Sequence, residues 1–186
     1  MALSFDKRDL TPGCLIHVYN RGNNKMIIYK SNADYKWFLN KAEYLRINDH
    51  FDVIAFCLMP NHFHFLLNTK TEDSLSKFFH RLQLAYAKYF NRKYSHSGHV
   101  FGGPFKTDVF RDEHHVTEIA RYIHMNPVSA GLITRPENWK WSNYKQLINY
   151  EIDLGSSFYS EIYGGFVEYK LFVESQLKET NFQRTE

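Results

Sequence analysis

The sequence predicts an α+β fold in which one antiparallel sheet has helices packed on it. Two apolar runs, at 51–58 and 62–67, are separated by a Met-Pro-Asn turn and therefore predict a hairpin. The apolar residues of 35–45 and of 75–90 recur at helical spacing, before and after that hairpin. A chain of 186 residues is long enough for one domain with a sizeable core.

The first elements follow from turn and capping signals. Leu-Ile-His-Val-Tyr-Asn at 15–20 predicts a strand, and Arg-Gly-Asn-Asn at 21–24 predicts the turn that closes it. Ser31 and Asp34 have the spacing of a capping box. We expect the helix that follows this cap to span about 32–48.

The remaining elements complete the sheet. The run at 51–58 is apolar almost throughout, which is typical of a strand buried on both faces. Thr-Glu-Asp at 71–73 opens the second helix, because acidic residues stabilise a helix N-terminus. Residues 106–111 predict a fourth strand. A further helix at about 113–125 should end before Pro127, which disfavours helical geometry in the preceding residue. The order β-α-β-β-α-β, followed by a helix, is the ferredoxin-like arrangement.

The C-terminal part of the chain predicts further helices. One is expected from Trp139 to Ile148, and one or two more between 158 and 177. We therefore expect residues 1–135 to form the main domain. Residues 136–186 are expected to form a helical extension that packs on the same domain.

Charge is distributed unevenly along the chain. Residues 77–111 contain seven Lys or Arg and one acidic residue, whereas residues 151–186 contain seven acidic and three basic residues. The basic middle indicates a polyanionic partner, although solvated helix faces explain it equally well. The apolar runs are too short to span a membrane. Cys14 and Cys57 form no disulfide or zinc pattern, so we expect a reducing, cytoplasmic location.

Two histidines stand at the start of the second hairpin strand. In a strand, side chains alternate between faces, so His62, His64 and Leu66 share one face. Two neighbouring imidazoles on a rigid strand provide half of a metal site. A buried histidine with a partner, next to a partly exposed one, is the simpler interpretation of this pattern alone.

Tyr122 and Asn126 lie on one stripe of the helix at 113–125, because they are four residues apart. His115 lies on the same stripe. A tyrosine at the edge of a core face is usually only packed there. Since the chain has 13 tyrosines, spacing alone does not select Tyr122.

Five motifs occur in order along the chain. They are His-Val-Tyr-Asn-Arg-Gly at 17–22, Leu-Met-Pro-Asn-His-Phe-His-Phe-Leu-Leu at 58–67, Tyr-Phe-Asn-Arg at 89–92, Gly-His-Val-Phe at 98–101 and Ala-Arg-Tyr-Ile-His-Met-Asn-Pro-Val-Ser-Ala-Gly-Leu at 120–132. In order and spacing, residues 15–135 resemble the single-tyrosine transposases of the HUH superfamily, in particular the REP-associated tyrosine transposases. Agreement of several motifs is much more specific than any one of them.

The resemblance implies a ferredoxin-like fold and assigns roles to four residues. Tyr122 would be the nucleophile. His62, His64 and Asn126 would hold a divalent metal, Mg²⁺ or Mn²⁺. Mixed nitrogen and oxygen ligands suit Mn²⁺ somewhat better, whereas availability favours Mg²⁺.

The implied reaction is cleavage of one DNA strand by the tyrosine phenolate, which leaves a 5′-phosphotyrosine and a free 3′-hydroxyl. The implied substrate is single-stranded DNA with hairpins or palindromic repeats, and the implied protein is a monomer or a homodimer. The motifs contain no acidic cluster for two-metal nuclease chemistry.

One loop departs from the family pattern. Relatives usually have Phe-Gln-Gly-Arg-Phe-Lys before the fourth strand, and this chain has Gly102 and Pro104 at the glutamine and arginine positions. If that arginine contacts DNA in relatives, Arg92 or Lys93 could supply the contact here. Basic residues with aromatic neighbours bind single strands. Our candidates for DNA contacts are Arg21, Arg92, Lys93, Lys106, Tyr94 and Phe105. A solvated or packed side chain explains each of them about as well.

Three alternatives remain open from the sequence. The chain could be a non-catalytic ferredoxin-like module that binds nucleic acid. It could be a nickase of the replication-initiator type, which shares the active site but usually has an additional domain. A zinc site at His96 and His99 or at His114 and His115 is a weaker alternative, because neither cysteine nor acid completes a tetrahedron around them.

Overall fold

The computed structural model describes residues 13–46, 51–70, 74–110, 113–149 and 165–183. The elements that form the sheet and its helices are β1 (Leu15–Arg21), α1 (Asn32–Leu45), β2 (Phe51–Met59), β3 (His62–Thr69), α2 (Ser74–Tyr94), β4 (Lys106–Phe110), α3 (Glu113–Ser129), α4 (Tyr144–Ile148) and α6 (Phe166–Gln183). The four strands form one antiparallel sheet in the order β2-β3-β1-β4. The predicted α+β class and its β-α-β-β-α-β order are confirmed.

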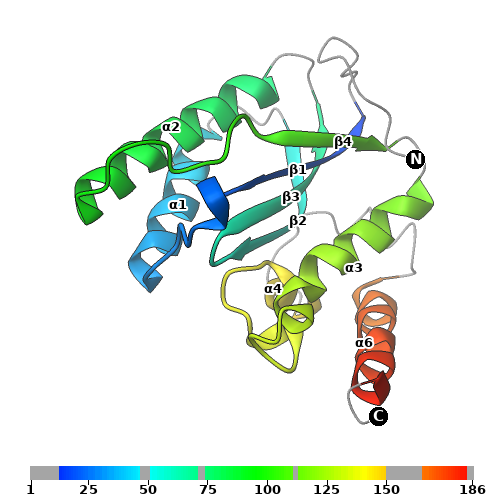
Figure 1. Cartoon of the computed structure of the whole chain (residues 1–186). Coiled ribbons are helices and arrows are strands. Elements are labelled where there is room, and N and C mark those ends of the chain that lie inside the picture. The colour runs from blue at the N-terminus through cyan, green and yellow to red at the C-terminus, as the bar shows by residue number, and fades with distance from the viewer. Residues whose placement is uncertain (1–12, 47–50, 71–73, 111–112, 150–164, 184–186) are drawn as a thin grey trace.

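The sheet lies between two layers of helices. Helices α1 and α2 cover one face, and α3, α4 and α6 lie on the other (Figure 1). Strand alternation separates the two cores. The core under α1 and α2 contains Val18, Phe63 and Phe79 among others. The core under α3 contains Leu66, Ala120 and Tyr169 among others.

The β2–β3 hairpin has the predicted two-residue turn. Met59 pairs with His62, so Pro60 and Asn61 form the turn. The carbonyl of Pro60 accepts hydrogen bonds from the backbone N–H groups of Ile28 and Tyr29, at 2.8 and 3.0 Å. The segment after β1 therefore fixes the point at which β3 begins, and with it the position of His62.

Gly22 belongs to the segment that holds this turn. Its N–H donates to the carbonyl of Asn61 at 2.8 Å, and a Cβ at this position would lie 2.2 Å from the carbonyl oxygen of Met26. Backbone cannot move aside as a flexible side chain can, so only glycine fits.

We expect Gly22→Ala to lower the free energy of unfolding by about 1–3 kcal/mol, as overpacking usually does. Urea unfolding followed by circular dichroism measures this. Gly102→Ala is the matched control, because its Cβ would lie 3.6 Å or more from the nearest atom, an ordinary contact. Equal stability of the two variants would contradict this account of Gly22.

The capping box of α1 is present as predicted, with the Asp34 carboxylate accepting from the backbone N–H of Ser31 at 2.8 Å. The predicted end at residue 48 was wrong: α1 ends at Leu45, where the N–H of Arg46 closes the last turn on the carbonyl of Ala42. The predicted opening of α2 at 71–73 lies outside the described residues, as does the end of the predicted fourth strand at residue 111.

Helix α3 continues beyond its predicted end. It runs through Pro127 to Ser129, so the predicted stop at residue 125 was wrong. The Asn126 amide donates to the carbonyl of Tyr122 at 2.8 Å, which adds a side-chain bond in the turn that proline weakens. The helix then ends before Gly131, whose φ of +69° favours glycine. The proline therefore lies in the last turn, where helices tolerate it better.

The predicted helix from Trp139 to Ile148 is shorter than expected. Only Tyr144–Ile148 is helical, after a 3-10 turn at Pro136–Asn138. The segment between them lies along the edge of β2, where the N–H of Leu58 donates to the carbonyl of Trp141 at 2.8 Å. Trp139 Nε1 returns a bond to the carbonyl of Leu58 at 3.0 Å. The backbone N–H and carbonyl of Leu58 on edge strand β2 would otherwise lack partners. Bonding to them stabilises an extended segment here, although the residue spacing favours a helix.

Helix α6 falls in the region where one or two helices were expected, and residues 150–164 lie outside the described part. Tyr169 of α6 hydrogen-bonds to His124 of α3 at 2.7 Å inside the second core. The division at residue 135 stays a prediction. None of the helices in the described ranges is both long and apolar enough to cross a membrane.

Candidate functional site

The two histidines of β3 lie on the sheet face that α3 partly covers. His62 pairs with Arg21 and His64 with Tyr19 across β1, and cross-strand partners share a face. The ring centroids of His62 and His64 are 5.0 Å apart. His64 is buried, whereas His62 is half-buried. The predicted alternation along β3 is therefore confirmed.

A third histidine supports His64. His17 Nε2 lies 2.9 Å from His64 Nδ1, and both rings are buried. His17 Nδ1 lies 3.6 Å from a carboxylate oxygen of Asp108, which favours a proton on that nitrogen. His17 then accepts at Nε2, and His64 donates from Nδ1. This arrangement leaves the lone pair of His64 on Nε2, which is buried without a hydrogen-bond partner.

His62 has the same tautomer as His64, with the proton on Nδ1. Its Nδ1 lies 2.6 Å from the side-chain oxygen of Asn61. An amide oxygen only accepts, so Nδ1 bears the proton and the lone pair is on Nε2. Both histidines of β3 thus have Nε2 available to a metal ion, with Nδ1 held by a neighbour.

Burial keeps the three imidazoles of the site uncharged. Desolvation, and secondarily the charge of Arg21, lowers the pKa of His62 to about 4. Desolvation likewise lowers the pKa of His17 to about 4, although Asp108 opposes the shift. The pKa of His64 is lowered well below its ordinary value, by burial first and then by His17 and His62. All three imidazoles are therefore neutral at pH 7, the form that binds a metal.

The ring of Tyr122 lies edge-on to those of His17 and His64. It lies on α3 and is 54% exposed, with its ring centroid 5.7 Å from that of His64 and 6.4 Å from that of His17. Tyr122, His17 and His64 line one open hollow of about 450 Å³, together with Tyr19, Asp108, Glu118 and Ile119. The fold thus brings together a phenol and an imidazole that are 58 residues apart in the sequence.

Asn126 lies one helical turn after Tyr122 and is half-buried. Its amide nitrogen donates to the carbonyl of Tyr122 at 2.8 Å. This bond uses only the nitrogen and leaves the amide oxygen, the atom that binds a metal. The role of Asn126 as the third ligand stays a prediction.

The four basic residues predicted to contact DNA fall into three settings. Arg21 and Lys106 are exposed and lie opposite His62 and Tyr19 in the strand register, beside the hollow. Arg92 is exposed near the end of α2. Lys93 instead bonds to the buried carboxylate of Asp34 at 2.6 Å. The structure therefore gives Lys93 a structural partner, and its DNA contact stays a prediction.

The loop that departs from the family pattern, with Gly102 and Pro104, runs beside the end of β1. The N–H of Gly102 donates to the carbonyl of Arg21 at 2.9 Å, and Phe101 forms a β-bridge with Gly22. A Cβ at Gly102 would make only ordinary contacts, so glycine is not required there by space. Among the described residues, no cluster of three His, Cys, Asp or Glu could hold a metal, which leaves the alternative zinc site without support.

The model of the IS200-like transposases matches residues 11–126, more than half of the chain. The chain belongs to the IS200-like transposase family. This membership assigns it to enzymes that bind DNA and act in DNA transposition. The matched range contains both β3 histidines, Tyr122 and Asn126.

Individual IS200-like relatives agree with this family. A REP-associated tyrosine transposase of Haemophilus influenzae is 26% identical over 136 residues, which cover 65% of this chain and 71% of that protein. The structure of a REP-associated tyrosine transposase bound to a REP hairpin superposes with a TM-score of 0.64 at 16% identity, covering 79% of this chain and 86% of that one. The second similarity concerns the fold alone.

Sequence reasoning missed several residues of the hollow in this IS200-like transposase. His17, Tyr19 and Asp108 reach it because β1 and β4 pair beside β3. The spacing of two residues between His17 and Tyr19 along β1 was a usable signal that they share a face. The contact between His17 and Asp108 depends on strand register, which one sequence does not reveal.

Proposed function

We propose that this protein is a metal-dependent, single-tyrosine transposase that cuts and rejoins one strand of hairpin-bearing single-stranded DNA. The observation that carries the proposal is the position of Tyr122, whose ring lies 5.7 Å from that of His64, a histidine with a buried and unpartnered Nε2. A nucleophile and a metal ligand then face the same hollow. Family membership supports DNA as the substrate.

The proposed reaction exchanges one phosphoester bond for another. The Tyr122 oxygen loses its proton and bonds to a DNA phosphorus. The bond between that phosphorus and the 3′ oxygen breaks, and the 3′ oxygen gains a proton. The product is a 5′-phosphotyrosine with a free 3′-hydroxyl. A second 3′-hydroxyl reverses the step and joins strands without ATP, because the phosphoester is retained.

The residues of the site fit a divalent metal. His62 and His64 each present Nε2, and Asn126 would supply an amide oxygen. When bound, Mg²⁺ or Mn²⁺ would polarise the phosphate and stabilise its developing charge. Arg21 lies opposite His62 and is suited to bind the DNA backbone beside the site.

The geometry favours attack by the tyrosine of the same chain. Tyr122 and His64 of one chain are already neighbours, so no second copy is needed to complete the site. We therefore propose that a monomer is sufficient for cleavage. The REP hairpin bound by the structural relative supports a hairpin as the substrate.

The test is incubation of the protein with a 3′-labelled hairpin oligonucleotide and Mn²⁺ or Mg²⁺, because the 3′ fragment is the one that stays joined to Tyr122. We expect a covalent protein–DNA adduct on a denaturing gel, and we expect EDTA to prevent it. If neither metal yields an adduct with any palindromic hairpin from the chromosomal flanks of its own gene, the proposed activity is wrong. DNA binding without an adduct would favour the non-catalytic module.

His17 and Asp108 should act on metal affinity through His64. We expect His17→Ala to weaken Mn²⁺ binding by about 10–100-fold, as loss of a residue that orients a ligand does. Asp108→Asn, which preserves the shape, should weaken binding in the same direction. Isothermal titration calorimetry measures both.

His96→Ala is the control for this prediction. His96 lies just after the C-terminal end of α2 and hydrogen-bonds to Asn91 of that helix, not to a residue of the histidine site. It should leave Mn²⁺ affinity unchanged. Unfolding in urea, measured on the same samples, separates metal affinity from stability. Unchanged Mn²⁺ affinity in both His17→Ala and Asp108→Asn would show that neither residue orients His64.

A further inference from the structure

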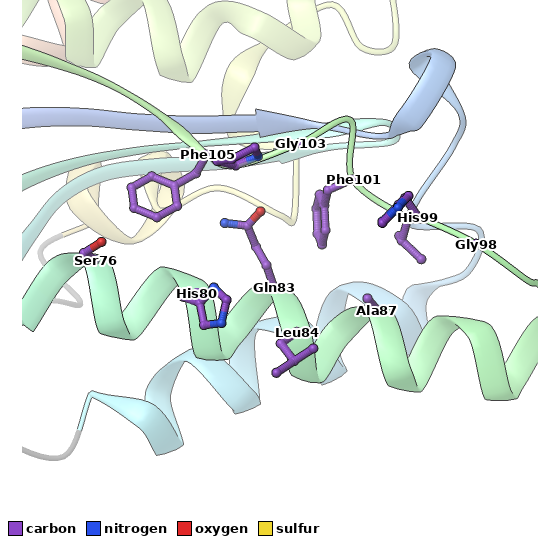
Figure 2. A pocket seen from close by; sticks show the side chains of 12 residues that line it. Ser76, His80, Gln83, Leu84, Ala87, Gly98, His99, Phe101, Gly103 and Phe105 are labelled. Carbon is purple, nitrogen blue, oxygen red and sulfur yellow. The ribbon is translucent and has the colours of Figure 1, made fainter.

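A second hollow lies on the opposite side of the sheet from the histidines of β3. It has a volume of about 560 Å³, which is in the usual range for ligand sites. Helix α2 forms one wall, and the loop that precedes β4 forms the other (Figure 2). The loop contains both departures from the family pattern, and Pro104 lines the hollow.

The walls of this hollow combine rings with one amide. The rings are those of His80, His99, Phe101 and Phe105, and Gln83 lies between them (Figure 2). The oxygen of Gln83 accepts from the Asn20 amide at 2.5 Å, and the same Asn20 nitrogen donates to the carbonyl of Gly103 at 2.9 Å. Asn20 thus fixes which way the Gln83 amide faces.

This orientation turns the Gln83 nitrogen into the hollow, on the side of Phe105 (Figure 2). Gln83 is only 8% exposed, so its donors are pre-positioned and shielded from bulk water. A flat heteroaromatic group with acceptor atoms at its edge matches a donor set between aromatic walls. Unpaired nucleobases have this chemistry.

The charge around the hollow suits a nucleic acid backbone. None of the residues that line it is acidic. Lys77, Arg81 and Lys88 are exposed on the helical stripe next to the one formed by His80 and Ala87. A strand with one base in the hollow could lay its phosphates along this basic stripe.

The hollow and the candidate active site are connected around the edge of the sheet. Strand β4 is an edge strand. Phe105, just before it, lines the second hollow, whereas Lys106 pairs with Tyr19, which lines the first. A single DNA strand that passes over this edge would meet both sites.

We propose that the hollow between α2 and the 98–105 loop binds one unpaired base of single-stranded DNA, with the adjoining phosphates on Lys77, Arg81 and Lys88. The proposal rests on the proposed function in one respect, namely that the substrate is a single DNA strand. Base stacking on aromatic side chains and backbone attraction together supply affinity with little dependence on sequence.

The first test measures affinity without cleavage. A fluorescein-labelled dT20 strand is titrated in EDTA with the full chain and with Ala87→Trp, which fills the hollow. We expect Ala87→Trp to weaken binding at least tenfold. Ala33→Trp, the same change at an exposed position of α1, should leave binding unchanged. His80→Ala, at an exposed side chain, should weaken binding about threefold and serves if Ala87→Trp does not fold.

The second test locates the base directly. The same strand with one 5-iodouracil is irradiated, and the crosslinked peptide is identified by mass spectrometry. We expect crosslinks within 76–87 or 98–105. Unchanged affinity in the folded hollow variants, or crosslinks confined to other segments, would overturn the proposal.

The outcomes also separate this proposal from the proposed function. If the hairpin adduct forms while Ala87→Trp and His80→Ala bind dT20 normally, only the base site is wrong. If no adduct forms but the hollow variants lose affinity, the base site stands and the transposase chemistry is wrong.

Discussion

Tyr122→Phe should abolish the covalent adduct with hairpin DNA while DNA binding is retained. The substitution removes one oxygen, the atom that we propose bonds to phosphorus, and keeps the ring that lies 5.7 Å from that of His64. We expect adduct formation to fall by at least about 10⁴-fold, which corresponds to loss of covalent catalysis. A denaturing gel with labelled DNA measures it.

Tyr122→Phe should not affect folding, because the ring is 54% exposed. Surface substitutions of this kind change the free energy of unfolding by about 0.5 kcal/mol or less. Tyr44→Phe is the matched control, since Tyr44 is an exposed tyrosine of α1. It should form the adduct at the normal rate. An adduct of normal yield with Tyr122→Phe would refute the assignment of the nucleophile.

Asp34→Ala should cause the largest loss of stability. Asp34 is fully buried, and its carboxylate accepts from Lys93 at 2.6 Å, Tyr94 at 2.7 Å and Tyr89 at 3.0 Å. The same side chain caps α1 at Ser31. Lys93 is exposed, so the loss comes from the helix cap and from the hydrogen bonds of the buried carboxylate, together about 3–5 kcal/mol. Urea unfolding measures the loss.

Glu43→Ala is the control for this prediction. Glu43 is exposed and forms an ion pair with Arg46, the residue that follows α1, and surface pairs contribute about 0–1 kcal/mol. We therefore expect its effect to be several-fold smaller than that of Asp34→Ala. Similar losses in both variants would mean that the buried network adds little.

The network also predicts how stability depends on pH. Burial opposes ionisation of Asp34, but the bonds from Lys93, Tyr94 and Tyr89 prevail and lower its pKa below the ordinary value. A lowered folded-state pKa stabilises the protein above the unfolded value of about 3.9, and this stabilisation is lost as the pH falls below it. The stability difference between the protein and Asp34→Ala should therefore shrink below about pH 4.

The sequence predicted the elements whose signals are local. The Pro60-Asn61 turn and the alternation of His62, Phe63 and His64 were sufficient to define the hairpin and its faces, because both depend on neighbouring residues. The end of α3 was misplaced because proline was given too much weight. Only the three-dimensional position of Pro127, in a last helical turn, shows that the cost there is small.

Contacts between distant segments were not predictable from one sequence. The extended course of the chain at Trp141 depends on the open edge of β2, and the support of His64 by His17 depends on strand register. Lys93 resembles a DNA contact in the sequence, yet its partner Asp34 is 59 residues away. Tyr122 was selected by resemblance to a family, and the structure adds its proximity to His64.

The most direct measurement is mass spectrometry of the trapped adduct after protease and nuclease digestion. We predict a single modified peptide in which the Tyr122 oxygen is joined to the 5′-phosphate of a nucleotide, with a free 3′-hydroxyl on the released strand. A phosphotyrosine at another position, or a link through a 3′-phosphate, would contradict it.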